Sequence, residues 1–178
     1  MNTPFKFAHA AHADWTRAAQ ACMTQLGAIP SAATLGFLYV SDAFAGELDA
    51  ILAFFKSATG VAHWTGSVGV GICATGVEYL EEPAMTVMLG EFEPADFSML
   101  PVLRTPQDID VQPLSDAYFA LVHGDPANNR IQALVEGLSA HVSSGFVVGG
   151  LSSSRGETAQ ISDGVVGGGL SGVLFSER

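Results

Sequence analysis

Apolar side chains recur at helical spacing in three stretches of the chain. These stretches are residues 12–26, 46–59 and 126–142. The first contains Asp14, a suitable N-cap, and stops at Gly27, while the second stops at Gly60. Pro126 suits the first turn of the third stretch. The pattern therefore predicts three amphipathic helices.

Short apolar runs outside these stretches are typical of β-strands. The runs cover residues 35–42, 66–73, 77–81, 84–92, 117–125, 145–154, 157–163 and 168–176. Residues 93–113 hold four prolines and show no sustained period. We therefore expect a linker with a little local structure there.

The order strand–helix–strand–strand–strand occurs twice, first in residues 35–92 and again in residues 114–176. When the two copies are aligned, Asp42 meets Asp125 and the apolar faces of the two helices coincide. Such self-similarity indicates an internal repeat. The predicted fold class is α+β, with mixed β-sheets flanked by helices and two pseudo-repeated β-α-β-β-β units. The units either pack face to face or extend one mixed sheet.

The composition is unusually apolar. The 178-residue chain is 48% hydrophobic and only 14% charged. A typical soluble domain is about 25% charged. Either much of the chain lies in sheets covered on both faces, or part of its surface contacts a partner. The length suits a single domain over residues 1–178.

Charge and cysteine usage argue against several classes of protein. The net charge is −11, and the seven Lys and Arg residues form no cluster. The chain therefore lacks a basic stripe for nucleic acid and a polybasic patch for a membrane. Cys22 and Cys73 are interpreted as free thiols of a reducing compartment. Because the N-terminus has no apolar signal-like stretch, we expect a cytoplasmic protein.

Candidate chemistry lies at two glycine-containing strand ends, residues 71–76 and 150–156. Their small residues leave backbone N–H groups open to a carboxylate or phosphate. Arg155 would add a charged donor, and Trp64 could stack on a ligand beside such a crevice. The alternative is a pair of ordinary hairpin turns. The candidate ligand-binding residues are Trp64, Gly71, Cys73, Thr75, Gly150, Ser152, Ser153 and Arg155.

The five histidines show no metal-binding spacing. His63 or His123 could ligate haem iron, since one axial histidine suffices; the alternative is a hydrogen-bonded histidine at the end of an element. His9 and His12 are expected to lie exposed near a mobile N-terminus. The sequence places no base beside Cys73, which favours a small structural residue over a nucleophile.

The two copies also resemble the N-terminal domain of the FIST family (FIST N). The resemblance covers nearly the whole chain apart from residues 93–113. Its most specific parts are WTGSVGVGICATG at 64–76, followed by Glu78, and the block 145–175, which begins GFVVGGLSSSRG. Members of this family normally continue into a second FIST domain. Because the sequence stops at Arg178, that C-terminal domain is expected to be absent.

The resemblance implies an intracellular sensory domain for a small ligand. FIST domains occur in bacterial signal-transduction proteins, and some members are similar to haem-binding nitric-oxide sensors that regulate histidine kinases. We therefore expect a non-enzymatic domain that binds an amino acid-like molecule or haem and signals through a partner such as a histidine kinase. The cofactor itself is unknown.

Two alternatives stay open. The first is an interaction or dimerisation module without a ligand. It would contact a second copy, or the missing C-terminal FIST domain, through an apolar patch near the last strand. The second, less favoured, is an enzyme that uses Cys73.

Overall fold

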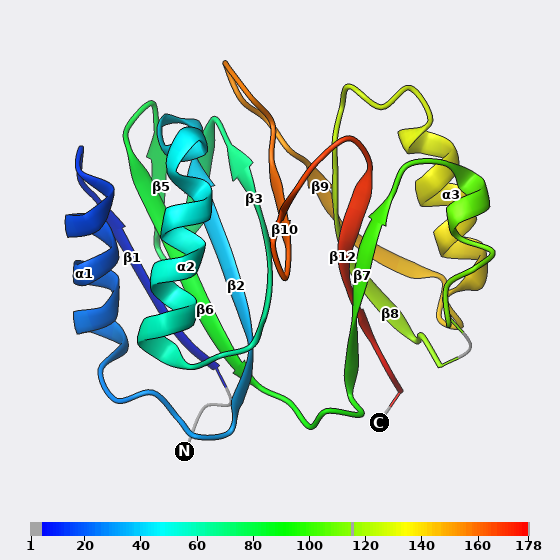
Figure 1. Cartoon of the computed structure of the whole chain (residues 1–178), viewed down its shortest axis with the longest axis horizontal. Helices are drawn as coiled ribbons and strands as arrows, with labels where there is room; N and C mark the ends of the chain where they lie inside the picture. The colour runs from blue at the N-terminus through cyan, green and yellow to red at the C-terminus, as the bar shows by residue number, and fades with distance from the viewer. Residues whose placement is uncertain (1–4, 115, 178) are drawn as a thin grey trace.

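Alternating side chains along strand β2 (Ala33–Ser41) show how the chain is layered. Leu38 and Val40 join a core cluster shared with helices, whereas Leu35 and Phe37 join a cluster shared with another sheet. Because successive side chains of a strand point to opposite faces, this strand is covered on both sides. The result is four layers in the order helix–sheet–sheet–helix (Figure 1).

This computed structural model describes residues 5–114 and 116–177. The predicted α+β class, with mixed sheets flanked by helices, is confirmed. Of the two arrangements left open by the sequence, the sheets pack face to face through the cluster around Leu35, Phe37 and Val173. No helix within the described residues is long and apolar enough to cross a membrane.

The first sheet has six strands in the order β1-β6-β2-β3-β10-β11. β2 and β3 are parallel, and all other neighbours in this sheet are antiparallel. Helices α1 and α2 pack on its outer face. The remaining bounds are Phe5–Ala11 for β1, Ala84–Glu91 for β6, His63–Gly69 for β3, Gln160–Ser162 for β10, Val165–Val166 for β11, Trp15–Leu26 for α1 and Leu48–Thr59 for α2.

The second sheet has four strands in the order β7-β12-β8-β9. β8 and β9 are parallel, and α3 packs on the outer face. A separate hairpin, β4–β5, contacts β2 and β6 of the first sheet. The bounds are Phe97–Leu103 for β7, Leu170–Phe175 for β12, Phe119–Gly124 for β8, Phe146–Leu151 for β9, Ile131–His141 for α3, Gly71–Ala74 for β4 and Val77–Leu80 for β5.

The three predicted helices are present, with shifted starts for two of them. Asp14 caps α1 by accepting from the Thr16 backbone N–H, and Gly27 follows the helix as predicted. α2 begins only at Leu48, because residues 42–47 form a 3-10 helix. α3 begins at Ile131 rather than at 126, because the Asp125 carboxylate accepts from Ala127 N–H in a turn.

Three strand predictions are corrected. The expected linker 93–113 contains β7, an edge strand of the second sheet, and a 3-10 helix at Pro106–Asp108. The expected strand 66–73 breaks at Val70 into β3 and β4, which belong to different sheets. The N-terminal segment forms β1, so His9 lies on an ordered strand and its Nδ1 is 2.6 Å from the Tyr79 hydroxyl.

The internal repeat stays a prediction. The orders β1-β6-β2-β3 and β7-β12-β8-β9 share the same succession of antiparallel and parallel pairs. The following strands differ, however, because β4 and β5 form a hairpin whereas β10 and β11 extend the first sheet. Superposition of the halves, with β2 on β8 and α2 on α3, is the measurement that tests common descent from a duplicated unit.

The expected apolar patch near the last strand is wrong. β12 lies between β7 and β8 and is buried over most of its length. Exposed apolar side chains instead gather on β9, the edge strand of the second sheet, at Phe146, Val148 and Leu151. An edge strand with exposed apolar side chains is a typical site of protein contact.

Candidate functional site

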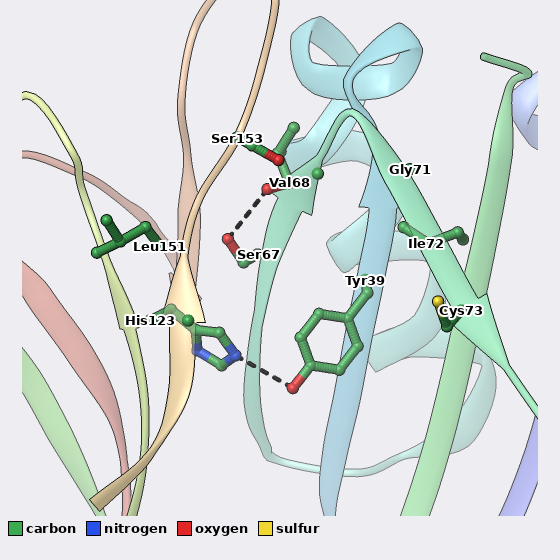
Figure 2. Close-up of a pocket in the computed structure, with 11 residues that line it drawn as sticks. Tyr39, Ser67, Val68, Gly71, Ile72, Cys73, His123, Leu151 and Ser153 are labelled. Atoms are coloured by element: carbon green, nitrogen blue, oxygen red, sulfur yellow. Dashed lines mark hydrogen bonds between the residues drawn. The ribbon is translucent and has the colours of Figure 1, made fainter. Parts of the chain in front are cut away.

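A pocket of about 340 Å³ lies between the two sheets, where the parallel strands β2, β3, β8 and β9 end. Its walls come from both sheets and from β4 of the hairpin (Figure 2). In sheets with parallel strands, ligands bind near the carboxyl ends of those strands. The lining residues are Tyr39, Ser67, Val68, Gly69, Gly71, Ile72, Cys73, His123, Gly150, Leu151 and Ser153.

Tyr39 and His123 join the two sheets across this pocket. Figure 2 shows the Tyr39 phenol reaching from β2 toward the His123 imidazole of β8, and its oxygen lies 3.1 Å from His123 Nε2. The rings meet edge to face with centroids 5.4 Å apart. The other ring nitrogen, Nδ1, lies 3.5 Å from the Thr65 hydroxyl. The imidazole is thus oriented from both sides.

Burial keeps both members of this pair uncharged near neutral pH. Desolvation lowers the pKa of His123 to about 4, because the interface stabilises a charged imidazolium poorly. The same cause raises the pKa of Tyr39 to about 12. The pair therefore offers a neutral phenol and a neutral imidazole to a ligand, and each can donate or accept a hydrogen bond.

This burial predicts acid sensitivity. His123 has a pKa of about 4 in the folded state, against about 6.5 for an unfolded chain. Between these values the unfolded chain binds a proton that the folded chain does not, so stability falls as pH drops from about 6.5 to about 4. The full shift corresponds to about 3 kcal/mol. Urea unfolding at several pH values measures it.

A matched pair of variants separates this effect from other titrations. His123→Gln should flatten the dependence on pH. His141→Gln, at an exposed position of α3, is the matched histidine-to-glutamine control. Equal pH dependence in the wild type and in the His123→Gln variant would contradict the assignment.

Hydroxyl groups make a second link between the sheets beside the pocket. Ser67 Oγ of β3 lies 2.7 Å from Ser152 Oγ, which follows β9. Ser153 Oγ accepts from Val70 N–H at 3.0 Å, and Ser153 N–H donates to Val68 O. These bonds attach the serine loop to the end of β3 and leave the Ser153 side chain at the pocket wall.

The two glycines of β9 have different roles. Gly149 has a φ of 138°, and a Cβ built there would lie 1.8 Å from Val122 O, so this glycine is required by the strand pair. A Cβ built on Gly150 would meet nothing within 4 Å. Gly150 pairs in register with His123 and lines the pocket. Its missing side chain therefore leaves space for a ligand.

The structure brings half of the predicted ligand-binding residues to this pocket. Gly71, Cys73, Gly150 and Ser153 line it. Thr75 lines an adjoining hollow, described below, and Ser152 is buried behind the wall, where it contacts Ser67. The two glycine-containing segments therefore border one shared pocket. Gly71 of the first segment and Gly150 of the second both line it.

Trp64 and Arg155 lie outside the pocket. Trp64 occupies the face of β3 that points toward the helices, is fully buried and donates from Nε1 to Val61 O, so it belongs to the core and does not stack on a pocket ligand. The Arg155 guanidinium donates to both carboxylate oxygens of Asp42, at 2.7 and 2.8 Å. This contact lowers the pKa of Asp42 to about 2. Arg155 thereby attaches its loop to the 3-10 helix that follows β2.

The structure places the two candidate haem-ligating histidines, His63 and His123, in different surroundings. Both ring nitrogens of His123 face hydroxyl groups inside the interface. His63 lies in a different hollow of about 500 Å³, where its Nδ1 contacts the Asp163 carboxylate at 2.9 Å. No lysine or arginine among the described residues lines that hollow to pair with haem propionates. Haem ligation by either histidine stays a prediction.

Sequence reasoning missed Tyr39 and Ser67. In the sequence, Tyr39 is indistinguishable from the apolar residues of its buried strand. Its partner His123 lies on the other sheet. The signal that could have found it is a hydroxyl-bearing aromatic at the carboxyl end of a parallel strand, where a buried phenol needs a hydrogen-bond partner. Ser67 offers the same signal at the end of β3.

Comparison with known proteins identifies one family. A family model described as the FIST N domain matches residues 34–178. A search of curated proteins finds no match. The FIST N family is associated with sensing and signal transduction. Because the match covers most of the chain, this protein belongs to the FIST N domain family.

Proposed function

We propose that the chain is a non-enzymatic sensory domain of the cytoplasm that binds a small ligand in the pocket between its sheets. One observation carries this proposal. Tyr39 of the first sheet and His123 of the second meet at the pocket wall, so a ligand there contacts both sheets at once. The match to a family of sensory domains supports the same function.

A ligand in this position would change how the two sheets pack against each other, and that change would be the signal. It would replace or extend hydrogen bonds such as Tyr39–His123, which now fix one sheet against the other. A ligand shifts an equilibrium between two packings only as far as its affinities for them differ. Because the ligand contacts both sheets, its affinity depends on how the sheets are packed.

The exposed side chains of β9 offer a surface for the signalling partner, which we propose to be a protein such as a histidine kinase. Phe146 is 68% exposed and Val148 is 42% exposed on an unpaired strand edge. β9 also carries Gly150 and Leu151 of the pocket, so the two regions share one strand. The two free cysteines, one of them exposed, support a reducing compartment.

The same edge favours a second candidate, an interaction module that pairs with a second copy or with a following FIST domain. Sedimentation velocity that finds only monomer at every concentration would remove the second-copy form of this alternative. For the enzyme alternative, no hydrogen bond within the described chain joins Cys73 to a histidine or carboxylate, so its nucleophile has no partner base to support it.

Nuclear magnetic resonance of the ¹⁵N-labelled protein tests the sensory proposal. A thermal-shift panel of small metabolites first identifies stabilising compounds, since a ligand that binds only the folded state raises Tm. Addition of such a compound should shift backbone amide signals on both sheets, near Ser67 on β3 and near Gly150 on β9. Shifts confined to the hollow at His63, or to one sheet, would contradict the proposal.

A further inference from the structure

The pocket continues beneath the β4–β5 hairpin. A second hollow of about 280 Å³ lies between this hairpin and the inner face of the first sheet. It shares Tyr39 and Cys73 with the pocket between the sheets, so the two hollows adjoin. The His9–Tyr79 contact of 2.6 Å attaches the hairpin to β1 above this second hollow.

The two hollows differ in chemistry. The pocket between the sheets carries the hydroxyls of Ser67 and Ser153 and the imidazole of His123. The hollow under the hairpin has apolar walls from Phe7, Phe37 and Met88. Thr75 and Thr86 also line it, and the Thr86 hydroxyl already donates to Ala8 O. Tyr39 borders both, with its hydroxyl directed to His123. A molecule that fills the two hollows therefore needs one polar end and one apolar end.

Charge narrows the ligand class further. No aspartate, glutamate, lysine or arginine of the described chain lines either hollow. A charged group placed there would lose part of its hydration and would meet no side chain of opposite charge. The net charge of −11 adds a long-range penalty for anions. The zwitterionic head of a free amino acid is disfavoured for the first of these reasons.

We propose that the ligand is an uncharged amphipathic small molecule. Its hydrogen-bonding head lies among Ser67, Ser153 and the Tyr39–His123 pair, and its short apolar tail lies under the hairpin against Phe7 and Met88. This inference rests on the proposed function, because it names the ligand class of the same site.

Four small probes test the ligand class by isothermal titration calorimetry or by the amide shifts described above. Hexanamide has a neutral head and an apolar tail. Hexanoate carries a charged head on the same tail, and hexylammonium carries one on a tail that is one methylene longer. Acetamide has the head with a single methyl group. We expect hexanamide to bind at least about 10-fold more tightly than each of the other three, because buried methylenes add affinity and an unpaired charge removes it.

Two phenylalanines of β1 supply the matched variants. Phe7 is 49% exposed and lines the hollow, whereas Phe5, on the same face of the strand, is 40% exposed and does not line it. Phe7→Ala should weaken hexanamide binding about 3-fold or more and leave acetamide binding unchanged. Phe5→Ala should change neither.

The outcomes separate this inference from the proposed function. If acetamide binds as tightly as hexanamide, or if Phe7→Ala leaves hexanamide binding unchanged, the apolar tail of the proposed ligand is wrong. Hexanoate or hexylammonium binding as tightly as hexanamide would overturn the uncharged head. If no probe binds while a metabolite from the panel still shifts amides on both sheets, the ligand class is wrong and the sensory site stands.

Discussion

Gly150→Val should abolish ligand binding at the pocket between the sheets while the protein stays folded. A Cβ at this position meets no atom within 4 Å, and the residue pairs with His123, which points into the interface. The two methyl groups of valine would therefore occupy the space that a ligand head needs. We expect at least about a 100-fold loss of affinity, with a change in stability of no more than about 1 kcal/mol.

Calorimetry with the strongest stabiliser from the metabolite panel measures the affinity, and urea unfolding measures the stability. Gly150→Ala is the graded control, because a single methyl group fills less of the pocket and should weaken binding by a smaller factor. A folded Gly150→Val protein that binds the ligand as the wild type does would remove Gly150 from the site.

The neighbouring substitution Gly149→Val should instead unfold much of the protein. Its Cβ would lie 1.8 Å from Val122 O on the paired strand, and the backbone φ of 138° is strained for any other residue. Neither problem can be relieved by choosing another rotamer, so we expect a loss of more than about 4 kcal/mol.

Circular dichroism with urea unfolding measures this loss. Gly149→Ala should be almost as destabilising, because the clash arises at Cβ itself. If Gly149→Ala changes the unfolding free energy by less than about 1 kcal/mol, then β9 pairs with β8 in another way. The contrast between adjacent glycines separates a residue required by the strand pair from one that leaves room for a ligand.

The helices follow closely from local sequence because their signals are local. The capping side chain of Asp14 and the glycines after α1 and α2 act within one helical turn, and the structure shows both helix ends where these residues place them. The start of α3 was misplaced because Asp125 uses its carboxylate in a turn that also binds Gly168 N–H. Gly168 is remote in sequence, so its effect could not be foreseen.

β7 was missed because prolines usually mark loops, and Pro101 lies in the middle of this strand. Among the described residues β7 is an edge strand paired with β12, and Pro101 lies at the register irregularity between Leu100 and Leu103, where a residue without an N–H group is tolerated. Position in the sheet therefore overrode a local signal. No pattern within residues 93–113 predicts that this segment forms the edge strand of a sheet.

The candidate site was predicted in part. Small residues at two strand ends identified Gly71, Cys73, Gly150 and Ser153, since a lack of bulk is visible in the sequence. The role of Arg155 was not predictable, because its partner Asp42, in the 3-10 helix after β2, is 113 residues away in the sequence. The same reason hides the Tyr39–His123 pair.

The pairing of β10 with β3 has a consequence for biosynthesis. β10 comes from residues 160–162, yet it extends a sheet whose four long strands, β1, β6, β2 and β3, end by Glu91. A ribosome that has released only the first half of the chain therefore presents β3 with one unpaired edge until the last segment emerges. Long-range strand pairing of this kind slows folding and exposes intermediates to aggregation. Protection of that nascent edge, by a chaperone or by rapid translation of the second half, would then govern the yield of folded protein.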